Sequence, residues 1–207
     1  MKLRYELIIG KSTMDMLVEN LGDYSTLLDL GCGPKSPIRL IPNRQDKFTV
    51  GIDSFAPYLE ASKIKRIHNQ YYQMDIRKMD ILPKIFDVVM AFDVLEHLTK
   101  EEGEKLIADM ELIAIKRVVI FTPNGFIKQD MSDDNPNQVH KSGWTVKEMR
   151  GKGYKVRGVN GLKWMRNPGA YLKIREKWFW LLSDFTQVFT YHIPELAFQL
   201  MCVKEMV

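Results

Sequence analysis

Two glycines and two carboxylates fall where the sequence changes from apolar runs to turns. Asp29 lies just before the glycine-rich turn Gly31-Cys32-Gly33, and Asp53 follows the next apolar run. Glycines in such a turn let the backbone approach a ligand closely, because they have no Cβ and adopt positive φ readily. A carboxylate at the end of the second strand of an α/β sheet is placed to accept hydrogen bonds from both ribose hydroxyls. Together these residues predict a nucleoside site.

The charge at this turn indicates which nucleoside would bind. A Walker A loop is excluded because no Gly-Lys-Ser/Thr follows, and a dinucleotide fingerprint would need a third glycine where Ser36 stands. Asp29 would also place negative charge near a pyrophosphate. S-adenosylmethionine fits better, since its ammonium and sulfonium groups are attracted to a carboxylate. Two interpretations without a ligand stay open: a plain strand-to-helix turn, and Asp53 as a cap for a helix that begins at Ala56.

The elements that must position these residues follow from the apolar pattern. Runs rich in Val, Ile and Phe are typical of buried parallel strands. They lie at 26–30, 48–52, 71–74, 86–92, 117–121, 154–159 and 198–203. Residues 99–114 are expected to form a helix with Thr99 as its N-cap, and Thr145 with Glu148 forms a capping box for a second helix that ends near Gly151. The alternation predicts an α/β fold.

The composition is that of one folded domain without an extreme charge. The chain has 207 residues, 45% of them hydrophobic, and its formal net charge of +4 comes from 30 basic and 26 acidic residues. This length suffices for a single core, so we expect one domain over 1–207. Cys32 and Cys202 are too few for a disulfide framework, and the apolar run before Gly10 is too short for a signal peptide or a membrane span. A cytoplasmic protein is expected.

Four short motifs, taken in order, resemble those of the class I S-adenosylmethionine-dependent methyltransferases. They are "LDLGCG", "GIDSF", "QMDI" and "FDVVMAFDVLEHL", and the resemblance covers about residues 25–124. It implies a Rossmann-like, seven-stranded, mostly parallel sheet with helices on both faces. The implied strand order is 3-2-1-4-5-7-6, with strand 7 antiparallel.

The resemblance also implies which residues hold the cofactor. Asp75 and Ile76 would border the adenine, while Phe92 and Asp93 would line the methionine side. The full expected set is Asp29, Gly31, Cys32, Gly33, Asp53, Ser54, Asp75, Ile76, Phe92 and Asp93.

Two histidines are the candidates for a general base. Methyl transfer from a sulfonium needs an aligned nucleophile and, for some acceptors, removal of its proton. His97 follows the fourth strand and His140 follows the fifth, so both lie at the carboxyl ends of strands, where open α/β sheets bind ligands. For His97, packing beneath the cofactor is an equal alternative. His68 and His192 are expected to be structural or on the surface.

Asp93, Glu96 and His97 would share one face if a helix began at Asp93. With His140 they resemble the Glu-x-x-Glu-His pattern of magnesium-dependent catechol-type and small-RNA ribose O-methyltransferases. Asp replaces the first Glu, and similar "DVLEHL" runs occur in metal-free relatives. We therefore expect no metal.

The acceptor is narrowed by motifs that the chain lacks. The chain lacks the Asn/Asp-Pro-Pro-Tyr/Phe motif of the methyltransferases that act on amino groups. It also lacks the lysine after the fifth strand that belongs to the catalytic tetrad of ribose-methylating enzymes. Transfer to an oxygen of a small-molecule, glycan or isoprenoid-like acceptor is favoured. The alternatives are an RNA methyltransferase, although nucleic acid is disfavoured, and a catalytically silent binding module. The polar segment 126–142 is expected either to cover the substrate pocket or to be solvated.

An aromatic and basic insertion is expected at about 163–194, between the last two strands. It holds Trp164, Trp178 and Trp180 among several lysines and arginines. Core packing or a dimer face is the favoured interpretation, and the protein is expected to be a monomer or a homodimer. A lid over an apolar substrate, or contact with the inner face of an anionic membrane, are the alternatives.

Overall fold

The seven strands form one continuous mixed sheet. The computed structural model describes residues 12–79, 85–130, 134–174 and 176–206. The strands are β1 (Thr26–Leu30), β2 (Phe48–Asp53), β3 (Gln70–Gln73), β4 (Phe86–Phe92), β5 (Ala114–Pro123), β6 (Lys155–Leu162) and β7 (Ala197–Glu205). Their order is β3-β2-β1-β4-β5-β7-β6, and β7 runs antiparallel to both β5 and β6. The other pairings are parallel, so the expected topology is confirmed.

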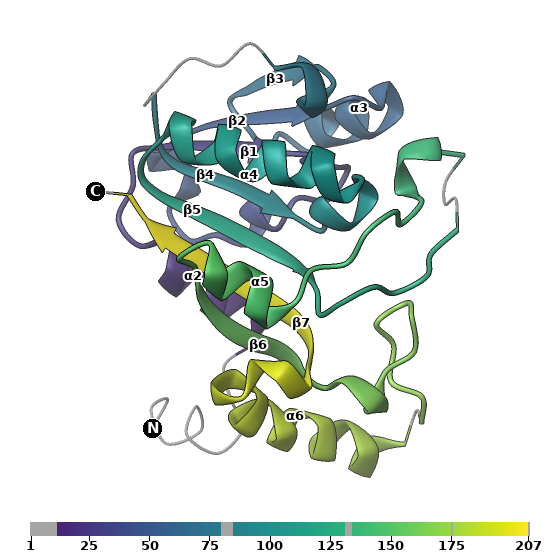
Figure 1. The fold of residues 1–207 in the computed structure, drawn as a ribbon. Coiled ribbons are helices and arrows are strands. Elements are labelled where there is room, and N and C mark those ends of the chain that lie inside the picture. Colours follow the sequence, from purple (N-terminus) through teal and green to yellow (C-terminus); the bar gives the residue numbers. More distant parts are fainter. Residues whose placement is uncertain (1–11, 80–84, 131–133, 175, 207) are drawn as a thin grey trace.

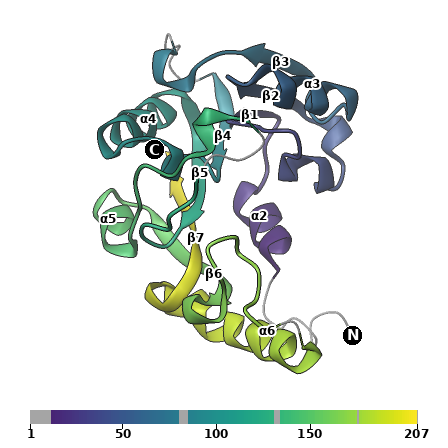
Figure 2. The ribbon, with the colours of Figure 1, turned by 90° about the vertical axis from the view of Figure 1, so that its right-hand side faces the viewer.

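Helices cover both faces of this sheet (Figures 1 and 2). The α-helices are α2 (Thr13–Leu21), α3 (Ala56–Ile64), α4 (Lys100–Ile113), α5 (Val146–Gly151) and α6 (Lys177–His192). The 3-10 helices are η1 (Pro37–Leu40), η2 (Arg44–Asp46), η3 (Ile76–Lys78), η4 (Leu95–His97), η5 (Pro136–Gln138), η6 (Lys163–Met165) and η7 (Pro194–Leu196). Two cores result, one beneath α4 and α5 and one beneath α2.

The predicted capping box at Thr145 is present, and the predicted N-cap Thr99 forms a capping box as well. Thr99 accepts a hydrogen bond from the backbone N–H of Glu102, whose side chain accepts one from the Thr99 N–H. Thr145 and Glu148 do the same at the start of α5. Each box satisfies two backbone donors at a helix start, which fixes where the helix begins.

β5 is longer than the sequence indicated. It begins at Ala114 rather than near residue 117, because Lys116 and Arg117 lie within the strand and direct their charged ends to Asp87 and Glu205. The pairing of β5 with β4 shifts register at this point, between the pairs Phe86–Ala114 and Val88–Arg117, so the charged residues coincide with an irregularity in the strand.

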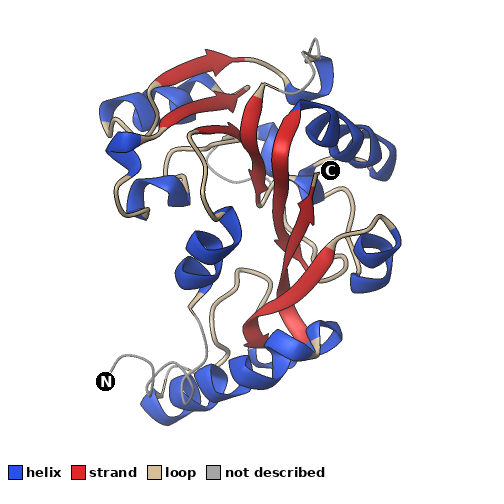
Figure 3. Ribbon diagram, turned by 90° about the vertical axis from the view of Figure 1, so that its left-hand side faces the viewer, coloured by secondary structure: helices blue, strands red, loops and turns tan. Residues whose placement is uncertain are grey.

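The insertion folds as η6, a connecting loop and α6, which packs along β6 (Figure 3). The prediction that the tryptophans of the insertion pack in the core is wrong, because Trp164, Trp178 and Trp180 are all exposed. Within the described ranges, no helix is long and apolar enough to cross a membrane. The N-terminal apolar run before Gly10 lies outside the described residues.

Candidate active site

A cavity of about 450 Å³ opens at the carboxyl ends of β1, β2 and β4. This is where parallel strands of open α/β sheets bind ligands. The expected residues that line it are Gly31, Cys32, Gly33, Asp53, Ser54, Asp75, Ile76, Phe92, Asp93 and His97. Most of the site predicted from sequence is therefore brought together at one place.

The glycine turn after β1 needs its glycines. Gly31 and Gly33 have φ of 67° and 57°, in the left-handed region that side chains disfavour. A Cβ at Gly31 would also lie 2.6 Å from the Val94 Cγ2 atom. The backbone of this turn thus forms the cavity wall without any side chain standing between it and a ligand.

Asp29 does not line this cavity. Its carboxylate is buried, where it accepts a hydrogen bond of 2.5 Å from the Ser36 hydroxyl and lies 3.3 Å from the His68 Nε2 atom. Ser36 caps η1, so Asp29 holds the far end of the turn rather than facing a ligand. His68 is buried beside it, which fits the structural role expected for this histidine.

Asp53 joins the turn to the start of α3. Its Oδ2 atom accepts a hydrogen bond of 2.9 Å from the Gly33 N–H, and its Oδ1 atom accepts one of 2.8 Å from the Phe55 N–H. Burial raises the pKa of this carboxyl, and the two backbone donors partly offset that effect. Asp53 is therefore part of the cavity wall and holds the residue before α3, but it does not cap that helix, whose N-cap Phe55 has no side-chain cap hydrogen bond.

Asp75 is held by Arg77, a residue that the motif search missed. The guanidinium donates to both carboxylate oxygens, with Nε–Oδ1 at 2.8 Å and Nη2–Oδ2 at 2.7 Å. These hydrogen bonds lower the pKa of Asp75. Arg77 also lies 3.4 Å from a carboxylate oxygen of Glu102, in the first turn of α4. The two acids fix the guanidinium at the edge of the cavity.

No helix begins at Asp93, so the expectation of a shared helical face is wrong. Asp93 has φ of 53°, η4 follows at Leu95–His97, and α4 begins only at Lys100. The Asp93 side chain is exposed where it opens onto the cavity, and its carboxyl accepts a hydrogen bond of 3.1 Å from Gln199. Partial desolvation by the surrounding protein raises the pKa of this carboxyl.

Glu96 turns inward, away from solvent. Its carboxyl accepts a hydrogen bond of 3.0 Å from the Thr122 hydroxyl. Burial, followed by the charge of Asp93, raises its pKa well above the ordinary value. Asp93 and Glu96 therefore form a carboxyl pair that is reluctant to carry two negative charges.

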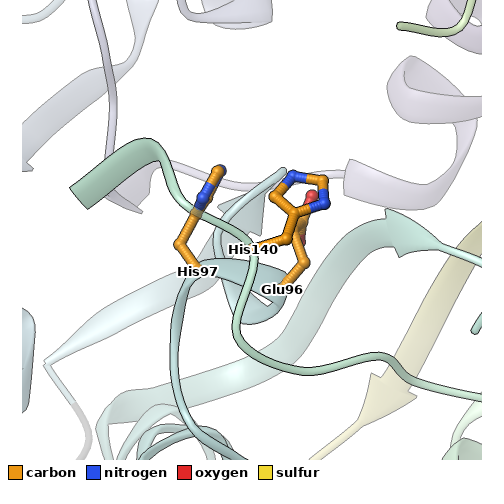
Figure 4. Close-up of side chains that lie close together, drawn as sticks. All are labelled: Glu96, His97 and His140. Carbon is orange, nitrogen blue, oxygen red and sulfur yellow. The ribbon is translucent and has the colours of Figure 1, made fainter. Parts of the chain in front are cut away.

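His97 and His140 meet beside Glu96 (Figure 4). Their ring centroids are 4.8 Å apart, and His140 Nδ1 lies 2.6 Å from the Ile127 carbonyl oxygen. Burial lowers the pKa of His97 to about 4, with the His140 charge as the next contribution, and burial also lowers the pKa of His140. Both imidazoles are neutral near pH 7.

Glu96, His97 and His140 each offer a ligand atom, and these atoms lie within 4.8 Å of one another. Asp93 is not part of this set. Two neutral imidazoles and one carboxylate are donors that suit a transition-metal ion or zinc.

Backbone hydrogen bonds bring His140 to His97. The Lys141 and Ser142 N–H groups both donate to the Glu96 carbonyl oxygen, at 2.7 and 3.1 Å. Trp144, which is fully buried, follows in the same loop. No side-chain pattern encodes these contacts, which is why the sequence could not show how the two histidines approach.

The described residues 134–142 of the polar segment 126–142 contribute to one side of the cavity, which agrees with the first of the two expectations for this segment. Asn135, Asn137, Gln138 and Lys141 line the wall, and Asn137 donates a hydrogen bond of 3.1 Å to the Ser54 hydroxyl. The lining also includes Lys35 and Arg39, which sequence reasoning did not single out.

Residues 28–120 match the family model described as a methyltransferase domain. A search of the curated proteins found no match to this sequence. This match and the order of the strands make the chain similar to the class I S-adenosylmethionine-dependent methyltransferases, which use S-adenosylmethionine as their cofactor.

Solved structures share the fold at low sequence identity. The methyltransferase domain of bacterial CtHen1 is 17% identical, with a TM-score of 0.58 over 96% of this chain and 100% of that one. Magnesium protoporphyrin IX methyltransferase from Synechocystis PCC 6803, with bound SAM, is 13% identical, with a TM-score of 0.54 over 100% and 91%. The plantazolicin methyltransferase BpumL, in complex with SAH, is 15% identical, with a TM-score of 0.54 over 98% and 79%.

Proposed function

We propose that this methyltransferase acts on an oxygen of a small-molecule, glycan or isoprenoid-like acceptor. The observation that carries the proposal is a pair of neutral imidazoles: His97 lines the cavity, and His140, which is not among the lining residues, contacts the His97 ring. A hydroxyl group must lose its proton as it attacks the methyl group, and a neutral imidazole within reach can accept that proton. The comparison structures named for a porphyrin and for plantazolicin support an acceptor other than nucleic acid.

The cofactor would lie between the glycine turn and β4. Gly31 and Gly33 let the backbone approach the methionine part, Asp53 and Ser54 accept and donate hydrogen bonds at the ribose, and Asp75 borders the adenine. The Asp93 carboxyl, open to the cavity, would face the cationic end. This assignment replaces Asp29, whose carboxylate is occupied by Ser36.

His140 would act together with His97. Because His140 Nδ1 lies 2.6 Å from the Ile127 carbonyl oxygen, that nitrogen carries the proton and donates it to the carbonyl. Nε2 is then the basic atom of the ring. His97 lines the cavity and contacts His140, so either ring can take the acceptor's proton as the methyl group leaves the sulfonium for the acceptor oxygen.

The test replaces His140 by Ala and by Gln, with His192 to Ala as the matched control on the exposed end of α6. Acceptors are screened by formation of S-adenosylhomocysteine. We expect His140→Ala to lower kcat at least tenfold while the cofactor affinity stays within about twofold, because general bases contribute 10²–10⁴-fold. An unchanged kcat for both His140 variants would contradict the role.

A metal at Glu96, His97 and His140 is the competing use of the same residues. It is distinguished by dialysis against a chelator, followed by metal analysis and assay. Loss of activity that a divalent cation restores would replace the proton-acceptor role by a metal-ligand role. Full activity without metal supports the imidazole base.

A nucleic-acid acceptor has one observation in its favour. Lys35, Arg39 and Lys141 line the cavity, and none of them forms a salt bridge within the described part of the chain, although the charge of Lys141 helps to lower the pKa of Glu102. These cations would attract any anionic acceptor, including a phosphate-bearing lipid at the inner face of a membrane. Activity on RNA that falls steeply with salt would select the nucleic acid. Absence of methyl release to every acceptor would leave a silent binding module.

A further inference from the structure

α6 presents its apolar side to solvent and its polar side to the sheet. Apart from Phe179, its buried side chains are Ser183, Thr186, Gln187 and Thr190. The opposite stripe is formed by residues that are between 41% and 60% exposed: Trp178, Leu181, Leu182, Phe185 and Phe189. We call this stripe the α6 apolar face. It follows the i, i+3, i+4, i+7 spacing that normally marks the buried side of a helix.

Hydrogen bonds fix this orientation. The Gln187 side chain donates to the Gly158 carbonyl oxygen and accepts from the Gly161 N–H, both at 2.9 Å. The Leu162 N–H donates to the Thr186 hydroxyl at 3.1 Å. Rotating α6 to bury its apolar face would break all three bonds and leave buried polar groups without partners, which is costly. The exposed apolar face is therefore a stable feature of the fold.

Further exposed aromatic and aliphatic side chains belong to the same insertion. They are Trp164, Tyr171, Ile174 and Trp180. An edge contact between Trp164 and Phe179, with centroids 6.4 Å apart, ties η6 to the first turn of α6. Three of the chain's four tryptophans are thus exposed in this region, whereas Trp144 is fully buried. Exposed apolar area on this scale marks an interaction site.

The charge of the insertion indicates what covers it. Residues 163–194 contain five basic and two acidic residues, a net charge of +3 against +4 for the whole chain. Lys173 and Lys177 flank the start of α6 and are exposed. Tryptophan, leucine and phenylalanine bordered by lysine are typical of helices that lie in the headgroup region of an anionic bilayer. A second copy of this chain would bring the same excess of positive charge to the interface.

The position of α6 on the molecule also favours a lipid bilayer as the surface that the α6 apolar face contacts. α6 lies at the outer end of the sheet beyond β6, and none of the residues of the α6 apolar face lines the cavity (Figures 1 and 2). A fluid lipid surface accommodates a protruding helix without a complementary groove. We propose that the α6 apolar face docks the protein on an anionic lipid bilayer. This docking rests on the insertion alone and not on the identity of the methyl acceptor.

The test measures sedimentation of the full chain with vesicles of phosphatidylcholine alone and with 30% phosphatidylglycerol. We expect binding to the anionic vesicles that weakens with salt, and a blue shift of tryptophan emission. Brominated lipid should quench the exposed tryptophans and spare Trp144. No binding to the anionic vesicles, or emission that brominated lipid leaves unchanged, would overturn the proposal.

Variants locate the contact. The combination Trp178→Ser, Leu181→Ser and Phe185→Ser should lower the partition coefficient at least tenfold, because three apolar side chains no longer enter the lipid. The matched control is Ile64→Ser with Leu112→Ser, two exposed apolar residues on α3 and α4. Equal losses for both sets would overturn the assignment.

Charge variants and oligomeric state complete the test. Lys173→Gln and Lys177→Gln should each weaken binding about fivefold on anionic vesicles and leave the weak binding to neutral vesicles unchanged. Far-UV circular dichroism and cofactor affinity, which the exposed substitutions should leave unaltered, verify folding. A dimer in light scattering that the triple variant converts to a monomer would assign the face to a second copy and overturn the proposal.

Discussion

Asp53→Ala separates the two roles that the structure gives this carboxylate. The substitution removes the acceptor of the Gly33 and Phe55 N–H groups, whose hydrogen bonds measure 2.9 and 2.8 Å. It also removes the proposed acceptor for the ribose hydroxyls. Hydrogen bonds to charged groups contribute about 1.5–3 kcal/mol each, and water can reach part of this cavity. We therefore expect cofactor affinity to fall by about 1–3 kcal/mol, which is roughly 5- to 150-fold in Kd.

The assay is calorimetric titration with S-adenosylhomocysteine, together with urea unfolding of the same proteins. Asp53→Asn keeps one oxygen acceptor and should lie between Ala and the unaltered chain. Asp46→Ala is the control, because Asp46 is exposed in η2 and does not line the cavity. Lower stability with an unchanged Kd would show that Asp53 only joins the turn to α3, and would refute its role in binding the ribose.

Two further predictions concern the turn and the carboxyl pair. Gly31→Ala should weaken cofactor binding at least tenfold and lower the free energy of unfolding by about 1–2 kcal/mol. The reason is that φ at this residue is 67° and that the new Cβ would meet Val94. Unchanged cofactor affinity and an unchanged free energy of unfolding would contradict this prediction. Raised pKa values of Asp93 and Glu96 mean that the folded state binds more protons than the unfolded state, so the free energy of unfolding should fall as pH rises toward 7 and beyond. Glu96→Gln should flatten that fall in urea unfolding between pH 5 and 8, and parallel pH profiles for the two proteins would disprove the coupling.

The central strands were predictable because both of their faces are buried. β1 and β4 pair on both sides in the middle of the sheet, so their residues read as continuous apolar runs. β5 was predicted too short, since the charged side chain of Lys116 interrupts the apolar run where the pairing with β4 also shifts register. The apolar pattern of a sequence indicates which side chains are buried. It indicates only indirectly how far the backbone pairing of a strand extends.

The residues of the site also divide into those that the sequence predicted and those that it missed. Residues carried by motifs, such as Gly31 and Asp53, were found because their chemistry is local to one turn. Lys141 and Asn137 were missed because they reach the cavity through a loop that backbone bonds to Glu96 hold in place. Asp29 was predicted from its place in the motif to face the ligand. Its carboxylate instead lies beneath the turn, where it accepts a hydrogen bond from Ser36.

α6 shows why periodicity alone could not assign its buried side. The helix has two stripes, and the apolar one would ordinarily pack on a sheet. What decides the orientation is β6: a Cβ at Gly158 would lie 2.1 Å from the Thr190 carbonyl oxygen, and one at Gly161 would lie 2.7 Å from the Ser183 carbonyl oxygen. So close an approach leaves no room for large side chains between helix and strand. The small and polar stripe must therefore face inward, which leaves the tryptophan, leucine and phenylalanine stripe to bind a separate surface.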